Sequence, residues 1–250
     1  MFIPLKTSAQ IAIMQKGGRI LANILSTLGK EAKAGITTGY LNKKADELFT
    51  LYKAEPSFKG YRGFPASICA SVNDEVVHGI PGDRILCEGD LLTIDCGVYY
   101  QGWHTDSAIT VPIGICNVEI ISFMKTAEKA LASAIKIARP GIPLGDISAI
   151  IEKTVHEKGY SVVHDLTGHG IGEKLHEPPQ IPNFGKKGSG PILKPGMTLA
   201  IEPIITMGKR FVETKSDNWT VVTKDGSLAC QVEHTIAVTE RGAEILTKNL

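Results

Sequence analysis

Residues 91–95 read Leu-Leu-Thr-Ile-Asp and residues 198–202 read Thr-Leu-Ala-Ile-Glu, so two apolar runs each end on an acid. Two later runs each begin on one: Asp106 precedes Ser-Ala-Ile-Thr-Val, and Glu233 precedes His-Thr-Ile-Ala-Val. Continuous β-branched and apolar residues over this length are typical of strands in covered sheets. The sequence therefore predicts two strand pairs, each of which carries two carboxylates near a buried face.

The two acidic strand pairs belong to an internal repeat. Asp95 and Glu202 are 107 residues apart, and the similar segments that begin at Gly35 and Gly141 are 106 residues apart. Matching offsets favour fused halves over independent domains. We expect one α+β domain over residues 1–250, with halves of about 1–115 and 116–250 that pair around a pseudo-twofold axis and bring the acids together at their seam.

Each half is expected to run helix, helix, strands. Gly29 and Gly35 punctuate the joint between the first two helices, and Pro140 and Gly159 stop the later two. The expected helices are 8–28, 38–53, 120–139 and 144–158, and the expected strands are 67–72, 91–99, 106–111, 198–205, 219–222 and 231–239.

The four acids need a partner in such surroundings. A buried carboxylate is costly unless it is protonated, paired with a base or bound to a metal. No Lys or Arg lies between Asp95 and Asp106, or from Gln231 to Thr239. Divalent cations from solution are therefore the simplest expected partners.

The composition excludes several classes of protein. The 250 residues include 27 basic and 26 acidic side chains, and a net charge of +1 does not indicate a DNA-binding protein. The five cysteines are odd in number and lack a Cys-x-x-Cys spacing, which argues against disulfides and a zinc ribbon and favours a reducing compartment. Because no signal pattern and no membrane-length apolar run is present, we expect a soluble cytoplasmic protein without membrane contact.

Three histidines add to the acids. His169 lies in Gly-His-Gly-Ile-Gly at residues 168–172, His176 follows it, and His78 begins His-Gly-Ile-Pro. No helical pattern follows the glycine-rich stretch, which argues against nucleotide binding, and no Gly-x-Ser-x-Gly motif supports a serine nucleophile. An oxygen-rich shell with one imidazole suits Mn(II), Fe(II) or Co(II) and does not exclude Zn(II).

Five of these residues, in the contexts TIDCG, HTDSA, GHGIG, AIEP and QVEHT, resemble the metal ligands of the methionine aminopeptidases. The stretches SVNDEVVHGIP, HEPPQIPN and WTVVTKDGS are similar to that family as well, so the resemblance spans nearly the whole chain. It implies the pita-bread (creatinase/aminopeptidase) fold of the bacterial type I enzymes, with two α+β halves around a central antiparallel sheet.

The resemblance also implies two divalent metal ions (Co, Mn, Fe(II) or Zn). Asp95 would bind one ion, and Asp106 and Glu233 would bridge the two. His169 and Glu202 would complete the shell of the other ion. Two ions about 3.5–4 Å apart can share a water and lower its pKa from about 15.7 toward 7.

The implied reaction is the removal of an N-terminal methionine that is followed by a small residue. The bridging hydroxide would attack the carbonyl carbon, and Glu202 would carry the proton from water toward the leaving amine. His78 and His176 match the family's two non-ligand histidines and would hydrogen-bond the scissile amide and the oxyanion.

A methionine side chain needs an apolar pocket, because thioethers pack well against aromatic rings. The chain departs from the common family pattern at Phe58, Phe64 and Leu175, which leaves the shape of the pocket open but not its apolar character. Four residues match the family positions that build the pocket: Tyr61, Phe64, Cys69 and Trp219.

Three other functions stay open. An X-Pro aminopeptidase or prolidase shares the fold and the ligand set, and a non-catalytic pita-bread module would bind peptides, chromatin or ribosomal partners. A two-metal phosphatase or nuclease would need Arg or Lys beside the acids to hold phosphate. For the aminopeptidase, the expected partners are nascent polypeptides and the ribosome, which the basic positions of residues 209–224 would face, and the chain is expected to be a monomer.

Overall fold

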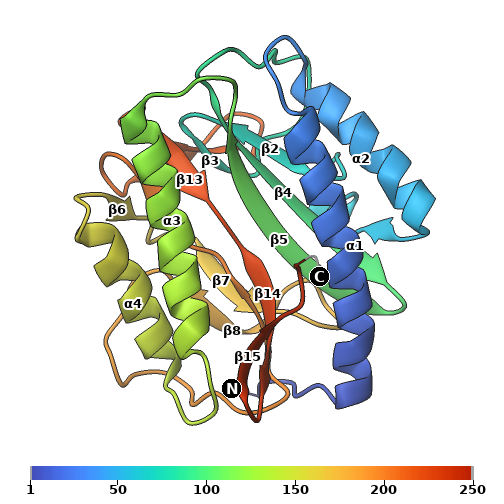
Figure 1. Cartoon of the computed structure of the whole chain (residues 1–250), viewed down its shortest axis with the longest axis vertical. Helices are drawn as coiled ribbons and strands as arrows, with labels where there is room; N and C mark the ends of the chain where they lie inside the picture. The colour runs from blue at the N-terminus through green and yellow to red at the C-terminus, as the bar shows by residue number, and fades with distance from the viewer. Residues whose placement is uncertain (1, 249–250) are drawn as a thin grey trace.

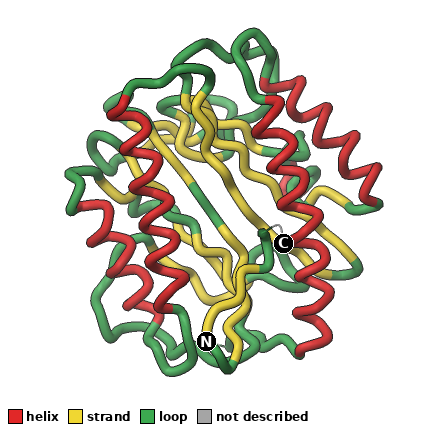
Figure 2. The backbone as a smooth tube through the Cα atoms, viewed as in Figure 1, coloured by secondary structure: helices red, strands yellow, loops and turns green. Residues whose placement is uncertain are grey.

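The structure is a computed structural model and describes residues 2–248. Two pairs of helices flank the strands, as Figure 1 and Figure 2 show. One pair is α1 (Ser8–Glu31) and α2 (Thr38–Tyr52), and the other is α3 (Val118–Ile137) and α4 (Leu144–His156). The order helix, helix, strands is thus present in each half of the chain, as expected, while the division near residue 115 stays a prediction.

The strands of residues 2–248 form four antiparallel sheets. The first sheet joins β1, β4, β2 and β5, the second β13, β10 and β6, the third β11, β12 and β3, and the fourth β15, β14, β9, β7 and β8. A 3₁₀ turn, η1 (Tyr61–Gly63), follows β1. The strands are β1 (Glu55–Pro56), β2 (Cys69–Val72), β3 (Glu75–Val77), β4 (Leu91–Tyr100), β5 (Trp103–Pro112), β6 (Ser161–Val162), β7 (Thr167–Gly170), β8 (Glu177–Pro182), β9 (Thr198–Ile201), β10 (Ile204–Thr206), β11 (Val212–Thr214), β12 (Val221–Thr223), β13 (Ala229–Gln231), β14 (His234–Thr239) and β15 (Gly242–Ile245).

Local capping determines where helix α1 begins, and packing against β5 determines how it continues. Thr7 and Gln10 form a capping box that starts the helix. The expected end near residue 28 is wrong, because the helix continues through Gly29 to Glu31. A Cβ on Gly29 would stand 3.0 Å from the Ile109 side chain, so this glycine lets the helix pack closely on β5 and does not stop it.

Two of the expected long strands are broken at their acids. The expected strand 198–205 divides into β9 and β10 at Glu202 and Pro203, because proline has no N–H for a sheet ladder. The expected strand 231–239 divides into β13 and β14 around Glu233. At Glu202 the chain leaves the fourth sheet and enters the second, and at Glu233 it returns from the second to the fourth, so each glutamate stands where two sheets meet.

Hydrogen bonds of side chains and backbone join β5 to the segment around Glu233 and so connect the two halves. The Ser107 hydroxyl donates to the Glu233 carbonyl at 2.6 Å, and the Glu233 N–H donates to the Ala108 carbonyl at 3.0 Å. The Thr235 hydroxyl accepts from the Asp106 N–H at 2.9 Å and donates to the Asp106 carbonyl at 2.7 Å. These hydrogen bonds hold Asp106 and Glu233 at one seam.

Apolar side chains cover both flanks of the seam. Leu21, Leu25 and Leu28 of α1 pack with residues of β2 and β4, whereas α3 and α4 pack with β9 and β14. Such burial supplies most of the favourable free energy of folding. Within residues 2–248, no helix combines the length and the apolar character that a membrane crossing requires.

Candidate metal centre

Asp95 and Asp106 lie on one face of the β4–β5 pair. Asp95 stands opposite Ala108, and Gly97 stands opposite Asp106, so the two carboxylates are diagonal neighbours. Both are buried, with 8% and 4% of their surface exposed. Asp106 lies inside β5, whose first residue is Trp103, so the expectation that the strand begins at this acid is wrong.

Glu202 and Glu233 lie opposite each other in the second half of the chain. The β9–β14 register sets Ile201 opposite His234, which brings the residues just beyond them, Glu202 and Glu233, together. Glu233 is 2% exposed. We call Asp95, Asp106, Glu202 and Glu233 the acid cluster.

His169 reaches the acid cluster from β7, which pairs with β9 through His169 and Ala200. Its Nδ1 lies 2.9 Å from the Gly170 carbonyl and donates to it in the neutral ring, which leaves the lone pair on Nε2. That Nε2 stands 3.8 Å from Glu202 Oε1. Two acceptors face each other here, so the arrangement calls for a cation between them.

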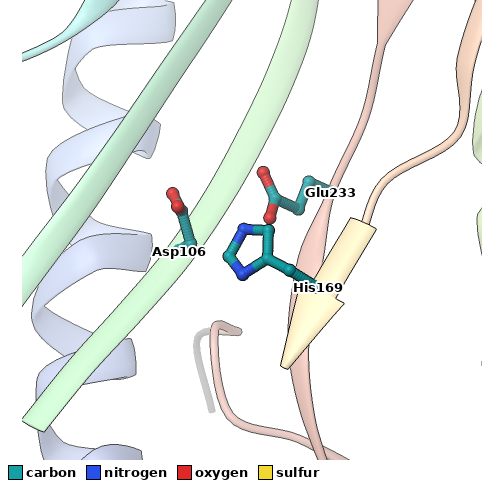
Figure 3. Close-up of side chains that lie close together, drawn as sticks. All are labelled: Asp106, His169 and Glu233. Carbon is teal, nitrogen blue, oxygen red and sulfur yellow. The ribbon is translucent and has the colours of Figure 1, made fainter. Parts of the chain in front are cut away.

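Asp106, His169 and Glu233 alone already form a metal-sized group. Their ligand atoms all lie within 4.8 Å of one another, and the three side chains are buried. Figure 3 shows the three side chains close together. They come from β5, β7 and the break before β14, three segments distant in sequence. Carboxylate oxygens with one imidazole nitrogen are a donor set that suits first-row divalent metals.

The acid cluster lacks protein cations. In the part of the chain that the structure describes, no Lys or Arg forms an ion pair with any of the four carboxylates. Asp95 Oδ1 and Glu233 Oε1 are buried without a hydrogen-bond partner. Because buried polar atoms are normally satisfied, these two oxygens are free for metal coordination.

Burial and mutual repulsion perturb the whole cluster. Burial raises the pKa of Asp95 to about 7. Burial, followed by the charges of neighbouring acids, raises the pKa values of Asp106, Glu202 and Glu233 well above their ordinary range. Burial lowers the pKa of His169, which keeps the ring neutral, as a metal ligand must be. The residues therefore fit divalent cations.

Gln231 is a member of this site that the sequence reasoning missed. Its Nε2 donates to Asp95 Oδ2 at 3.4 Å and to Glu202 Oε2 at 3.2 Å, so it ties the two halves of the acid cluster together. The sequence contains a signal for Gln231, because it precedes Glu233 by two positions, which is the spacing of side chains on one face of a strand.

A cavity of about 300 Å³ opens over the acid cluster, and every site residue expected from the sequence lines it. Phe64 and Trp219 meet edge to face with ring centroids 5.1 Å apart, beside the buried thiol of Cys69. Phe58 and Leu175, two of the departures from the family pattern, belong to the same wall. The remaining lining residues, which were not expected, are Arg62, Val77, Asp165, Leu166, Thr167, Ile204 and Gln231.

His78 and His176 stand above the acid cluster. His78 adopts a left-handed backbone (φ 58°), which aims its half-buried ring toward the cavity wall at Trp219, 6.3 Å away between ring centroids. His176 is an exposed rim residue whose ring centroid lies 4.3 Å from that of His169. Its Nδ1 is 2.9 Å from the Tyr61 hydroxyl. His176 is therefore next to the acid cluster through His169, whereas His78 shares the cavity lining with both.

Comparisons with known proteins agree with this geometry. The profile of metallopeptidase family M24 matches residues 12–240. Methionine aminopeptidase 1 of Bacillus subtilis (strain 168) is 47% identical over 243 residues, which cover 97% of this chain and 98% of that protein. The methionine aminopeptidase of Escherichia coli (strain K12) is 39% identical over 249 residues, which cover 99% of this chain and 94% of that protein.

Solved structures of other proteins share this fold. The crystal structure of a methionine aminopeptidase from Thermotoga maritima superposes with a TM-score of 0.98 at 43% identity, and the match covers 99% of this chain and 100% of that one. A prolidase from Pyrococcus furiosus superposes with a TM-score of 0.80 at 25% identity, over 98% of this chain but 66% of that one. The expected pita-bread fold is confirmed, and the chain belongs to metallopeptidase family M24, within it to the bacterial type I methionine aminopeptidases.

Proposed function

We propose that this chain removes the N-terminal methionine from peptides and nascent proteins, with two divalent cations held by the acid cluster and His169. The observation that carries the proposal is the set of carboxylates at the floor of the cavity that, within residues 2–248, have His169 beside them but no Lys or Arg partner. Membership of family M24 supports the use of divalent metal. Asp95 would hold one ion, Asp106 and Glu233 both, and His169 with Glu202 the other.

Two divalent cations held there would supply an activated water at neutral pH and positive charge near the scissile carbonyl. Glu202, whose side chain is 11% exposed, lies beside His169, where it would take a proton from the attacking water and deliver it to the leaving amine. His78 and His176 donate hydrogen bonds to the scissile amide and to the oxygen that becomes negative. The surrounding apolar wall excludes bulk water and strengthens these interactions.

The shape of the cavity supports methionine as the first residue. Phe64, Trp219 and Cys69 offer polarizable and aromatic surface, against which a thioether packs well. Tyr61 and His176, whose hydroxyl and Nδ1 lie 2.9 Å apart, line the cavity where the second residue would pass. The preference for a small second residue comes from the resemblance to the family.

The test begins with protein stripped by a chelator and reloaded with Mn(II), Fe(II), Co(II) or Zn(II). We expect metal-dependent release of methionine from Met-Ala-Ser, and a loss of about 10²–10⁴-fold in kcat for Glu202→Gln, the range for a general acid–base group. The metal content of each sample separates a lost proton carrier from a lost ligand.

The same assay discriminates the alternatives. Cleavage of an Ala-Pro peptide without release of methionine would assign the chain to the X-Pro enzymes, whose fold the Pyrococcus furiosus prolidase shares. No cleavage of either peptide with any metal would favour a non-catalytic binding module.

We propose the ribosome as a partner through the exposed segment that contains Lys209 and Arg210. Phe211 beside them is 52% exposed, whereas Lys215 is engaged with Glu75 at 2.8 Å. Reversal of Lys209, Arg210 and Lys215 to Glu should reduce co-sedimentation with ribosomes. The matched control reverses three exposed lysines of α3, and an equal loss there would refute a specific contact: Lys125, Lys129 and Lys136.

A cytoplasmic, monomeric protein is part of the same proposal. All five cysteines are free thiols, three of them buried, which is typical of a reducing compartment. Sedimentation velocity at the assay concentration tests the monomer, and a stable dimer would contradict it.

A further inference from the structure

Arg62 lies at the rim of the cavity, on a turn whose backbone is held by hydrogen bonds and flanking glycines. Its backbone is left-handed (φ 50°), between Gly60 (φ 84°) and Gly63 (φ 88°). The Tyr61 N–H donates to the Phe58 carbonyl at 2.9 Å, and the Gly60 N–H donates to the Phe64 carbonyl at 2.8 Å. Because these contacts determine the backbone, the direction in which the Arg62 side chain leaves the turn is determined too.

Among the described residues, no acidic side chain neutralises the charge of Arg62. Its side chain is exposed and lines the cavity, and among residues 2–248 it forms no ion pair. Its nearest described aromatic contact is the Tyr61 ring, whose centroid lies 5.4 Å from Cζ. By contrast, Arg84 and Lys215 both pair with Glu75. A free cation at the mouth of a pocket is available to a ligand.

Contacts connect this cation to the metal centre. The His169 and His176 ring centroids are 4.3 Å apart, and those of His176 and Tyr61 are 5.3 Å apart. Arg62 therefore lies outward from the acid cluster by way of His176 and Tyr61. Its positive charge also helps to lower the pKa of His176, after burial and His169, so its field reaches the mouth of the cavity.

The charge along the cavity therefore changes sign, from the carboxylates at its floor to the positive charge of Arg62 at its rim. A peptide whose amino group faces the acid cluster extends outward past His176 and Tyr61. Each residue of an extended chain advances by about 3.3–3.6 Å, so the third and fourth residues come to the level of Arg62. We propose that Arg62 is a specificity-determining residue that favours an acidic side chain at the third or fourth position of the substrate, a preference that rests on the proposed aminopeptidase function.

Asp165 is the opposing charge at the same cavity. It is exposed and also lines the site, so it attracts basic side chains. We assign the stronger influence to Arg62, because the hydrogen bond between Tyr61 and His176 fixes its turn against the reacting groups. The wild type should therefore already prefer acidic peptides, and Asp165→Asn should increase that preference.

The test compares kcat/KM for Met-Ala-Glu-Glu-Ser, Met-Ala-Lys-Lys-Ser and the neutral Met-Ala-Ser-Ser-Ser, with metal-loaded enzyme at low ionic strength. The wild type should prefer the acidic over the basic peptide by about threefold to tenfold, the size of one or two exposed ion pairs. Arg62→Gln should remove the preference for the acidic peptide and leave the weaker attraction of Asp165 for the basic one, and Arg62→Glu should invert the preference clearly. Added salt at about 0.5 M should reduce it, because salt screens exposed charges.

Lys59→Glu is the matched control. Lys59 is an exposed cation in the same turn region, pairs with Asp46 at 3.4 Å and does not line the cavity. It should keep the wild-type ratio. An unchanged ratio in Arg62→Glu, or an equal inversion in Lys59→Glu, would overturn the proposal while methionine is still released. Failure to release methionine from the neutral peptide in any sample would instead refute the underlying function.

Discussion

At the residue scale, His176 connects the metal centre to the rim of the cavity. Its ring lies against His169 on one side and accepts or donates a hydrogen bond with the Tyr61 hydroxyl at 2.9 Å on the other. This hydroxyl sets the orientation of the ring, because the imidazole itself is exposed and would otherwise rotate. The chemistry of His176 therefore depends on Tyr61 as well as on its own position.

Two substitutions separate these contributions. His176→Ala should lower kcat by about 10²–10³-fold, the usual effect of removing one donor to a developing oxyanion. Tyr61→Phe should cost at most about tenfold, since it removes a single hydrogen bond worth roughly 0.5–1.5 kcal/mol. Steady-state kinetics on Met-Ala-Ser measures both.

Metal content provides the control for this prediction. His176 and Tyr61 are not among the five expected ligands, so both variants should bind as much Mn(II) as the wild type. Loss of metal from His176→Ala would mean that the histidine acts by supporting His169, and would contradict a direct role at the scissile amide.

At the scale of elements, the segment before α1 is tied to the segment that carries His176. Lys6 Nζ lies 2.5 Å from Glu177 Oε2, and their side chains are 3% and 7% exposed. The Lys6 N–H donates to the Gly196 carbonyl at 2.7 Å, and Gly172 lacks a Cβ where the Lys6 side chain passes. This pair joins positions 171 residues apart and anchors the start of β8 beside His176.

Breaking this pair from one side should be costly. Lys6→Met leaves the Glu177 carboxylate buried without a counter-charge, so we expect a loss of about 3–5 kcal/mol in the free energy of unfolding. The double variant Lys6→Met with Glu177→Gln should recover most of that loss, because no uncompensated charge remains. Urea unfolding of both variants measures the difference.

The exposed pair of Lys44 and Glu47, at 3.2 Å, provides the comparison. Lys44→Met should cost less than about 1 kcal/mol, as solvent-exposed ion pairs do. If the double variant at Lys6 and Glu177 is as unstable as Lys6→Met alone, the packing of the lysine stem and not its charge holds the segment.

At the scale of the whole molecule, the acid cluster joins the two halves and sets a dependence of stability on pH. The raised pKa values mean that protonated carboxyls favour the metal-free fold. That stabilising contribution is present below the unfolded pKa values of about 4 and is lost as the pH rises through the folded values, of which Asp95 is about 7. Divalent cations replace the missing protons.

We therefore expect Mn(II) to raise the melting temperature of the metal-free protein more at pH 8 than at pH 5.5. At a thousandfold excess over Kd the added free energy is about 4 kcal/mol. Calorimetry with and without metal measures it, and Asp95→Asn should reduce the difference between the two pH values. An equal effect of metal at both pH values would show that the carboxyls stay charged in the metal-free fold.

Much of the architecture could be predicted from local patterns. The amphipathic runs and their glycine and proline boundaries predict four helices close to α1–α4, and the apolar runs before Asp95 and Glu202 predict β4 and β9. The predictions failed where packing overrides a local signal. Helix α1 passes through Gly29, and the strand after Glu202 breaks because Pro203 turns the chain into another sheet.

The sequence by itself determined the family, the acid cluster and the apolar residues around it, since residue types at these spacings carry the chemistry. Only the tertiary structure decided that Gln231 bridges Asp95 and Glu202, that Lys6 anchors Glu177, and that Arg62 stands at the rim. Helix and strand patterns are local in sequence, whereas these contacts join positions up to 171 residues apart. Such contacts exist only once the seam between β5 and the Glu233 segment has formed, because no local periodicity encodes a pairing across the two halves.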